Sequence, residues 1–481
     1  MAHSTTNGNG FRLSWDSRFI RIVIPILFAA LFFILPSPQG LSPQAWKLFG
    51  IFVGTILMLM LQGLPEPSAI FVGVASAGLM VVPLKDVLVG YTDSTVWLIV
   101  TAIMMSIGFK KSGLARRIGL ILIKAFGKSS LGLGYVFSFM DLLLATSIPA
   151  APARGGGLVY PLCQGVFDVV DSKPDQNPRR LGSYLTVLLY MISMTTGSLF
   201  ITGMGPNVLS TKLADQILGI QISWPLWTMA ALPGFIAFLF IPWVVYRIYP
   251  PEMHSVEGVR RMARGELEEL GPVDWKEMVV AATFLLALGL WATSTISKID
   301  VAIVAFLGVT IMTLFNIIQW KDIVETKETW SILIWFGGII GLSSALDKVD
   351  FFKWLTLQME QSLPIGGTNV FIAFIIIALV AILPHYVFPS LVGYVAAFAP
   401  VLFSFVAVTG VPKYPAFFLI AYLMVVSSTL THYGNGLGPL LFGTGYVDKK
   451  TWWKIGFVVT ALTTILYLTV GLFYWKLIGL W

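Results

Sequence analysis

Two long apolar stretches of this sequence are interrupted by residues that cannot continue a helix. In residues 131–170 the interruption is a Pro/Ala/Gly cluster that carries Arg154, and in residues 366–408 it surrounds Pro384 and Pro389. Inside a bilayer, backbone that is not helical is tolerated only where it is buried in protein or lines a watery cavity. Two such breaks, in corresponding halves of a chain, are typical of the midplane binding site of a secondary transporter.

The composition of the chain excludes a soluble globular domain. Of its 481 residues, 57% are hydrophobic and only 11% are charged, which indicates an all-α polytopic membrane protein. The net charge of +7 comes from Lys and Arg in short loops between apolar spans, so we expect a lipid bilayer, and no nucleic acid, as partner. The sequence has no His-Glu-x-x-His zinc motif and no phosphate loop. We therefore expect no enzyme, no cofactor and no metal site.

A helix needs about 20 apolar residues to cross the hydrocarbon core. By this measure we expect about eleven transmembrane helices, and we expect the two interrupted stretches to form re-entrant hairpins that each enter and return on one side. Two full crossings in place of each hairpin remain the alternative, because loop parity is the same for both. The expected spans are 19–36, 45–62, 67–84, 94–109, 181–218, 224–247, 277–296, 299–318, 329–346, 413–446 and 452–478.

Basic residues predict the orientation of these spans. Lys and Arg flank the first hairpin on both sides and also occur near the N-terminus, so we expect this face to be cytoplasmic. Parity then places the C-terminal Trp481 on the extracellular or periplasmic side. The polar segment 248–276 has charges of both signs at helical spacing and predicts an amphipathic surface helix. Segments 115–127 and 350–363 are predicted to be short interfacial helices.

A weak internal repeat relates the two halves of the chain. A span that begins near Thr95 is followed by an interfacial helix and the first hairpin, and a span that begins near Glu328 is followed by the same elements and the second hairpin. Five crossings separate the two starting points. Because this number is odd, the units should be oppositely oriented, as in the inverted repeats of secondary transporters.

The segment 202–210 is expected to break a helix and to bind an anion. Gly205 and Pro206 favour the break, which leaves the free amides of a new helix N-terminus, and such an end attracts negative charge. Asn207 adds a donor and an acceptor, and Thr202 adds a hydroxyl. A simple kink is the alternative, because Gly and Pro are common in membrane helices.

The segment 431–439 repeats this pattern in the second half of the chain. Thr431 and His432 precede a Gly/Asn cluster that includes Gly434 and Asn435. We expect this cluster to contact substrate, with His432 in a binding or charge-balancing role. Of the other polar groups in this half, His385 is expected to be a hydrogen-bonded packing residue. Tyr394 is expected either to donate to a carboxylate or to pack as an ordinary aromatic side chain.

Arg154 is an isolated charge within an apolar stretch of forty residues. A charge at the bilayer centre costs at least about 2.5–3.5 kcal/mol on insertion scales, so it must be compensated. An internal pair with Asp141 or Asp215, or snorkelling to the interface, are the alternatives. Because Pro152 and three glycines surround it, we expect Arg154 to lie at the hairpin tip and to bind an anion there, since a guanidinium matches a carboxylate with two hydrogen bonds.

Four motifs of this sequence resemble the divalent anion/sodium symporter family. They are IPAAPARGGGLVYP at 148–161, ITGMGPNVLS at 201–210, PHYVFPS at 384–390 and LTHYGNGLGP at 430–439. The resemblance runs from about Ser42 to the C-terminus. It is to the dicarboxylate exchanger branch in particular, which includes citrate/succinate and tartrate/succinate antiporters and plastid 2-oxoglutarate/malate translocators.

The resemblance implies a homodimer that works by an elevator mechanism, in which a scaffold domain holds the interface and a transport domain moves. The domains it implies are a cytoplasmic N-terminus at 1–18, scaffold helices with the first interfacial arm at 19–128, the first half of the transport domain at 129–223, further scaffold helices with the loop 248–276 at 224–364, and the second half of the transport domain at 365–481.

The family's Ser-Asn-Thr motif at each hairpin tip, which binds substrate and helps to hold sodium, is missing. At the first tip its place is taken by Ala150, Ala151 and Pro152, and at the second tip it is absent around 392–395. An Ala/Pro tip such as the first offers no side-chain oxygens to a hard cation.

The predicted function is sodium-independent, obligatory exchange of dicarboxylates across the inner (plasma) membrane, with 2-oxoglutarate, malate, succinate or fumarate as substrates. The hypothesis behind it is that fixed charges on Arg154 and His432 replace sodium ions. The empty site would then keep an unpaired charge that is costly to move through a low-dielectric barrier. A sodium-coupled di- or tricarboxylate symporter is the alternative.

Overall fold

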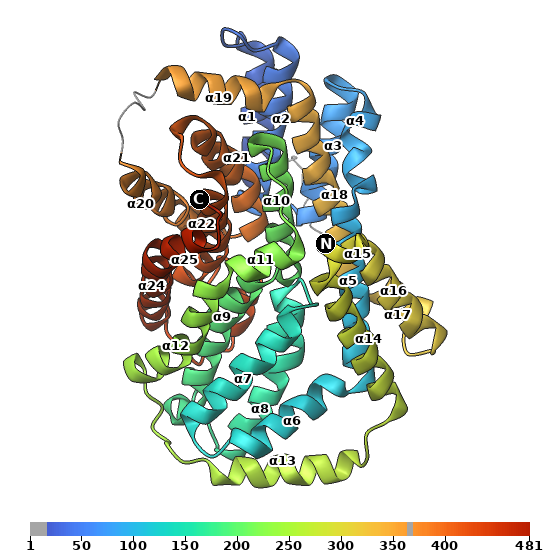
Figure 1. Ribbon diagram of the computed structural model, residues 1–481, viewed down its shortest axis with the longest axis vertical. Coiled ribbons are helices and arrows are strands. Elements are labelled where there is room, and N and C mark those ends of the chain that lie inside the picture. The colour runs from blue at the N-terminus through green and yellow to red at the C-terminus, as the bar shows by residue number, and fades with distance from the viewer. Residues whose placement is uncertain (1–16, 363–368) are drawn as a thin grey trace, which may run out of the picture.

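The computed structural model describes residues 17–362 and 369–481 of the chain. Helices dominate this part, and its single β-type pairing is an isolated bridge between Ser129 and Ser255. Most of the predicted N-terminal segment 1–18, and the first residues of the predicted stretch 366–408, lie outside the described residues. Figure 1 shows the molecule with its longest axis vertical and the helices distributed along its length.

The α-helices up to the polar segment are α1 (Ser17–Ile34), α2 (Pro43–Leu61), α3 (Glu66–Met80), α4 (Leu84–Leu88), α5 (Ser94–Ser112), α6 (Leu114–Phe126), α7 (Ser130–Ala145), α8 (Tyr160–Val169), α9 (Gly182–Leu199), α10 (Gly205–Leu218), α11 (Trp224–Ala230), α12 (Leu232–Ile248) and α13 (Glu257–Leu270). The remaining α-helices are α14 (Trp275–Ala292), α15 (Ser294–Ser297), α16 (Val301–Leu314), α17 (Trp320–Glu325), α18 (Lys327–Lys348), α19 (Phe351–Ser362), α20 (Val370–Val380), α21 (Leu391–Thr409), α22 (Lys413–Val426), α23 (Leu437–Phe442), α24 (Lys449–Leu466) and α25 (Leu472–Leu477).

The number of helices that can cross a membrane is smaller than the predicted eleven. By length and composition, 8 helices of the described residues qualify, or 9 if α11 and α12, bent by 52°, form one span. The expected spans coincide with helices, but some of these are short: α3 has 15 residues and α16 has 14. The chain is nevertheless an all-helical, multi-pass membrane protein.

All four predicted helix breaks are present. The chain is not helical between the end of α7 and Ala150, and a π-helix, η2 (Pro152–Val159), then leads into α8. A 3₁₀ turn, η5 (Leu383–Val387), separates α20 from α21. The turn η4 (Ile201–Gly203) separates α9 from α10. In the second half, the turn η6 (Ser427–Leu430) follows α22, and a non-helical segment then leads to α23. Pro and Gly at these positions remove backbone donors or side-chain support, which explains why the helices end there.

The helix–break–helix units α7–α8 and α20–α21, called here the first and second hairpin, lie in opposite halves of the molecule. Figure 1 shows α7 and α8 in its lower half and α20 and α21 in its upper half. Between them lie α9 and α22, which contact each other and are buried along almost their whole length. Length alone does not identify the second hairpin, because 370–387 and 391–409 are each long and apolar enough to cross a membrane.

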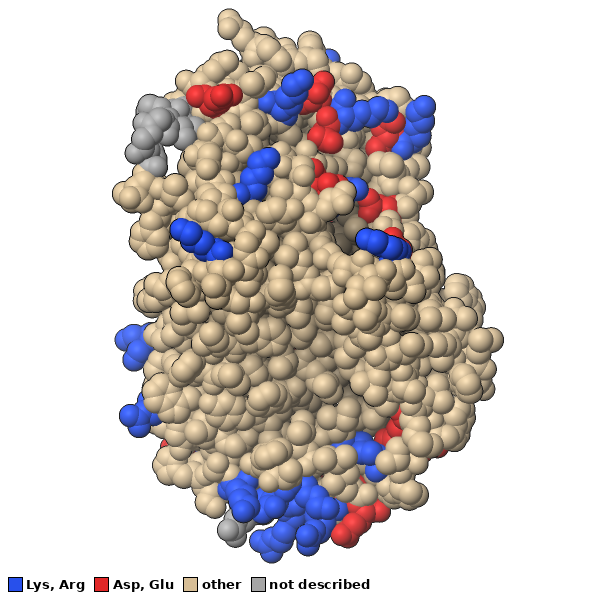
Figure 2. All heavy atoms as spheres, viewed as in Figure 1, with Lys and Arg blue, Asp and Glu red and all other residues tan. Residues whose placement is uncertain are grey.

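Charged residues gather at the two ends of the long axis. Figure 2 shows a broad region with almost no charge on this face, and a cluster of Lys and Arg at the lower end. At that end Figure 1 shows α13, the amphipathic helix predicted within 248–276. The predicted interfacial helices at 115–127 and 350–363 are also present, as α6 and α19.

Glycine allows α18 to contact the backbone that follows α4. A Cβ on Gly341 would lie 1.7 Å from the carbonyl oxygen of Val87, and one on Gly90 would lie 2.0 Å from the carbonyl oxygen of Gly337. These contacts are between backbone atoms, so a larger residue cannot be accommodated by a rotamer change. They fix the position of α18 against α4, and α18 together with α3 forms one wall of the cavity described next.

Candidate functional site

The tips of both hairpins and both helix breaks line one central cavity of about 330 Å³. The first hairpin contributes Pro149 to Ala153, and the second contributes Pro389 to Val392. The break between α9 and α10 contributes Gly205 and Pro206, and the break before α23 contributes Asn435. Of the predicted site residues, Pro152, Gly205, Pro206 and Asn435 therefore lie at this cavity.

The opposite wall of the central cavity comes from α3 and α18 and carries two carboxylates. Glu66 is the first residue of α3 and is half-buried, and Glu328 lies in the first turn of α18 and is exposed. Both line the cavity, together with Ser331 and Trp335. The sequence has no signal that singles out these two residues, because an acidic residue in the first turn is also what the dipole of any helix favours.

The central cavity adjoins a second cavity of about 430 Å³ that extends toward the lower end of the molecule. The two share Pro152, Ala153 and Glu328 as lining residues. The second cavity also includes Ser106 and the exposed Lys110, near the end of α5. The charged residues that line the second cavity are therefore Lys110, Glu325 and Glu328.

Arg154 does not face the central cavity. Its side chain is fully buried, and Nε donates to Oδ1 of Asp141 at 3.1 Å. Nη1 donates to the carbonyl oxygens of Ile148 at 2.8 Å and Gly203 at 3.0 Å, and Nη2 donates to that of Ser193 at 2.9 Å. Of the two alternative pairs, that with Asp141 is present. The guanidinium does not line the cavity at the hairpin tip, where the sequence predicted an anion contact.

Asp141 completes this buried network. Its Oδ1 also accepts from the hydroxyl of Ser193 at 2.8 Å, and its Oδ2 accepts from the hydroxyl of Thr196. A buried ion pair persists when its remaining donors and acceptors are hydrogen-bonded, as they are here. The pair is neutral as a whole, so Arg154 leaves no unpaired charge, and this corrects the charge hypothesis of the sequence analysis.

His385 makes the corresponding contacts in the second half of the chain. It is buried, its Nε2 lies 3.0 Å from the carbonyl oxygen of Gly434, and its Nδ1 lies 2.7 Å from the hydroxyl of Ser427. Because a carbonyl can only accept, Nε2 carries a proton and donates it to Gly434. Arg154 and His385 thus each donate to a glycine carbonyl in one of the two helix breaks, at Gly203 and at Gly434.

Thr202 and Asn207 are buried and make hydrogen bonds within the protein. The hydroxyl of Thr202 donates to the carbonyl of Thr146 at 2.5 Å. Nδ2 of Asn207 donates to the carbonyl oxygens of Gly197 at 2.7 Å and Phe200 at 2.8 Å, so it satisfies the free carbonyls at the end of α9. Neither side chain lines the central cavity, although Oδ1 of Asn207 is buried without a partner among the described residues.

The polar residues predicted in the second half lie around the cavity without lining it. Tyr394 is buried, and its ring lies 4.5 Å from that of His385. His432 accepts from Nε1 of Trp453 at 3.1 Å, which is a packing contact and does not direct it to the cavity. Thr431 is buried, and its hydroxyl has no partner in the part of the chain that the structure describes.

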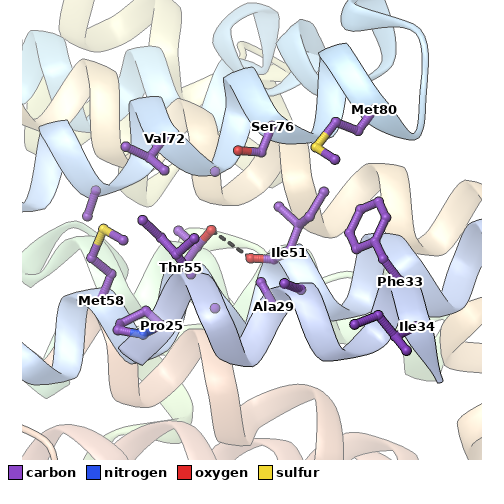
Figure 3. A pocket seen from close by; sticks show the side chains of 15 residues that line it. Pro25, Ala29, Phe33, Ile34, Ile51, Thr55, Met58, Val72, Ser76 and Met80 are labelled. Atoms are coloured by element: carbon purple, nitrogen blue, oxygen red, sulfur yellow. Dashed lines mark hydrogen bonds between the residues drawn. The ribbon is translucent and has the colours of Figure 1, made fainter. Parts of the chain in front are cut away.

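A further cavity, between α1, α2 and α3, does not suit an anion. Figure 3 shows it lined mainly by apolar side chains, among them Phe33 and Met58. Its hydroxyls include that of Thr55, which donates to the carbonyl of Ile51 at 2.8 Å (Figure 3). The central cavity, with its helix ends and polar side chains, is therefore the candidate functional site.

Comparisons with known proteins find relatives that match nearly the whole length of the chain. The sequence model of the sodium:sulfate symporter transmembrane region matches residues 16–481. The chain is 38% identical to inner membrane protein YbhI of Escherichia coli, over 96% of this chain and 98% of the relative. It is 31% identical to the citrate/succinate antiporter of the same organism, again over 96% and 98%.

A solved structure supports the fold at a much lower identity. The structure of MtrF of Neisseria gonorrhoeae superimposes with a TM-score of 0.54 and 13% identity, and covers 94% of both chains. This likeness concerns the fold alone. On the sequence matches, which span nearly the whole length, the chain is a membrane transporter and not an enzyme, and it belongs to the divalent anion/sodium symporter family.

Proposed function

We propose that this protein is a sodium-independent, obligatory exchanger of dicarboxylates. The observation that carries the proposal is the occupation of both helix breaks by fixed side-chain donors. In transporters with discontinuous helices, unwound backbone carbonyls coordinate the coupling sodium ion. Here the carbonyl of Gly203 accepts from Arg154 and the carbonyl of Gly434 accepts from His385. A covalently attached donor then fills the place of the cation in both halves of the site.

The hairpin tips support the same conclusion. Ala150, Ala151 and Pro152 have no side-chain oxygen, so the first tip has only backbone groups to offer a hard cation. The description of the matching family names a sodium symporter. These three residues are where the present sequence lacks the family's sodium-binding motif. The loss of side-chain oxygens at the first tip and the hydrogen bonds from Arg154 and His385 both support transport without sodium.

The proposed substrates are 2-oxoglutarate, malate, succinate and fumarate. Gly205 and Pro206 begin α10 at the cavity, and Leu391 begins α21 there, so two helix N-termini face it. The positive end of a helix attracts carboxylates. At α10 this attraction comes from the helix dipole, because the amide of Gly205 already donates to the carbonyl of Pro149 at 3.3 Å and Pro206 has no N–H. Two ends, one in each half of the site, suit a molecule with two carboxylates. Succinate is also one of the substrates in the name of the E. coli antiporter.

The proposed mechanism is an elevator. A transport domain of both hairpins and both interrupted helices, 129–223 and 365–481, would move against scaffold segments 19–128 and 224–364 in a homodimer. The opposite placement of the hairpins (Figure 1) supports inverted repeats. The cavity that leads to Lys110, and the basic lower end (Figure 2), support a cytoplasmic opening, a cytoplasmic N-terminus and a periplasmic or extracellular C-terminus, in the inner membrane.

A sodium-coupled di- or tricarboxylate symporter is the second candidate. Two carboxylates in the central cavity, Glu66 and Glu328, favour it, because they could supply oxygens to a cation.

Counterflow in liposomes separates the two candidates. Purified protein is reconstituted with internal malate, succinate, 2-oxoglutarate or no dicarboxylate, and uptake of labelled succinate is followed with external sodium or choline. The exchanger requires internal dicarboxylate and is indifferent to sodium. Uptake into empty vesicles that depends on a sodium gradient would favour the symporter.

A further inference from the structure

A hydrogen bond joins the start of α3 to the tip of the second hairpin. The hydroxyl of Ser390 donates to Oε1 of Glu66 at 2.9 Å, across 324 positions of the sequence. Ser390 is also the N-cap of α21, and its Oγ accepts from the amide of Gly393 at 3.3 Å. Both Glu66 and Ser390 line the central cavity.

The chemistry at this contact is that of a bound carboxylate. α21 has 19 residues, and its first turn, including Leu391 and Val392, lies at the cavity. The positive end of such a helix and the Ser390 hydroxyl attract an anion, and the group found there is the carboxyl group of Glu66. A substrate carboxylate offers the same two oxygens and the same charge. It cannot take that place while Glu66 holds it, because the two groups repel each other and compete for one donor.

We propose that Glu66 is a displaceable lock, which holds the second hairpin to the scaffold when the carrier is empty and is released when a substrate carboxylate takes Ser390. This inference rests on the proposed function. The lock explains why exchange is obligatory, which the neutral Arg154–Asp141 pair does not explain. An empty transport domain must break the Glu66–Ser390 contact without compensation in order to move, whereas a loaded one has already exchanged it for the substrate.

The test compares net efflux with exchange in the same vesicles. Liposomes loaded with labelled succinate are diluted into buffer with or without unlabelled succinate. We expect wild-type protein to release label only with external succinate. Glu66→Gln should raise net efflux about tenfold or more, because a charge-assisted hydrogen bond is replaced by a weaker neutral one. It should also lower the KM for succinate.

Two variants sharpen the result. Ser390→Ala removes the lock as well and should raise net efflux, but it should raise KM because the substrate loses a donor. Glu269→Gln, an exposed carboxylate on α13, is the matched control and should behave as wild type. Thermal melts establish that each variant is folded.

The lock is refuted if folded Glu66→Gln keeps wild-type exchange with wild-type net efflux, or if it loses exchange altogether. The proposed function fails separately, through the wild-type protein alone, if external succinate does not accelerate its efflux.

Discussion

Replacing Arg154 by alanine tests whether its guanidinium stands where a cation would otherwise bind. The substitution removes an ion pair and three hydrogen bonds to backbone carbonyls, all fully buried. It also leaves Asp141 as a buried carboxylate without its counter-charge. Breaking one partner of a buried pair costs about 3–5 kcal/mol. We therefore expect Arg154→Ala to unfold at a clearly lower denaturant concentration than wild type in choline buffer.

Sodium should return part of this stability to the variant. The space left by the guanidinium is surrounded by the carbonyls of Ile148, Gly203 and Ser193 and by the Asp141 carboxylate, all of them oxygen ligands. A ligand present at 100 times its dissociation constant stabilises the folded state by about 2.7 kcal/mol. Saturating sodium should thus recover a large share of the loss in Arg154→Ala, and should leave wild type unchanged.

The assay is the denaturation midpoint in sodium, potassium and choline chloride at equal ionic strength. The control is Arg154→Ala combined with Asp141→Asn, which keeps the cavity and removes its charge, and this protein should respond weakly to sodium. Equal midpoints for Arg154→Ala in sodium and choline would refute the view that the guanidinium occupies a cation's place. A variant as stable as wild type would refute the structural role of the pair.

Three further predictions concern the second break, the interfacial arm and the α18 contact. His385→Ala removes two buried hydrogen bonds and should cost about 2–4 kcal/mol, with loss of exchange, in a denaturation and counterflow assay. Arg117→Ala breaks the buried pair between α6 and α14 and should cost about 3–5 kcal/mol, whereas Arg116→Ala, in an exposed pair, should cost less than about 1 kcal/mol by the same measurement. Gly341→Ala places a Cβ against backbone and should lower the yield of folded protein in size-exclusion chromatography, whereas Gly289→Ala, with open space around it, should not.

The breaks and the surface helices could be predicted because they depend on local chemistry. The adjacent Gly205 and Pro206 favour the end of one helix and the start of another, and the structure confirms the break at that position. The same holds for α13, whose charges repeat at helical spacing. The span count was less accurate, because apolar runs do not show where a helix stops short of the full width of a membrane.

The partners of the polar residues could not be predicted, because they depend on packing between distant segments. The sequence allowed Arg154 to form an ion pair with either Asp141 or Asp215. Only the fold of the first hairpin brings Asp141 to it. Glu66 was overlooked, since its meeting with Ser390 joins residues 324 positions apart. The sequence pattern predicted the segments that line the central cavity, and the tertiary structure determines which side chains lie at it.

Sodium dependence of exchange tests the central claim most directly. Labelled succinate uptake is measured in proteoliposomes that contain unlabelled succinate, with sodium or choline chloride outside at equal ionic strength. If Arg154 and His385 replace the coupling cation, the initial rates are the same in both salts and fall to background when the vesicles contain no dicarboxylate. A rate that rises with external sodium and persists in empty vesicles would contradict the account.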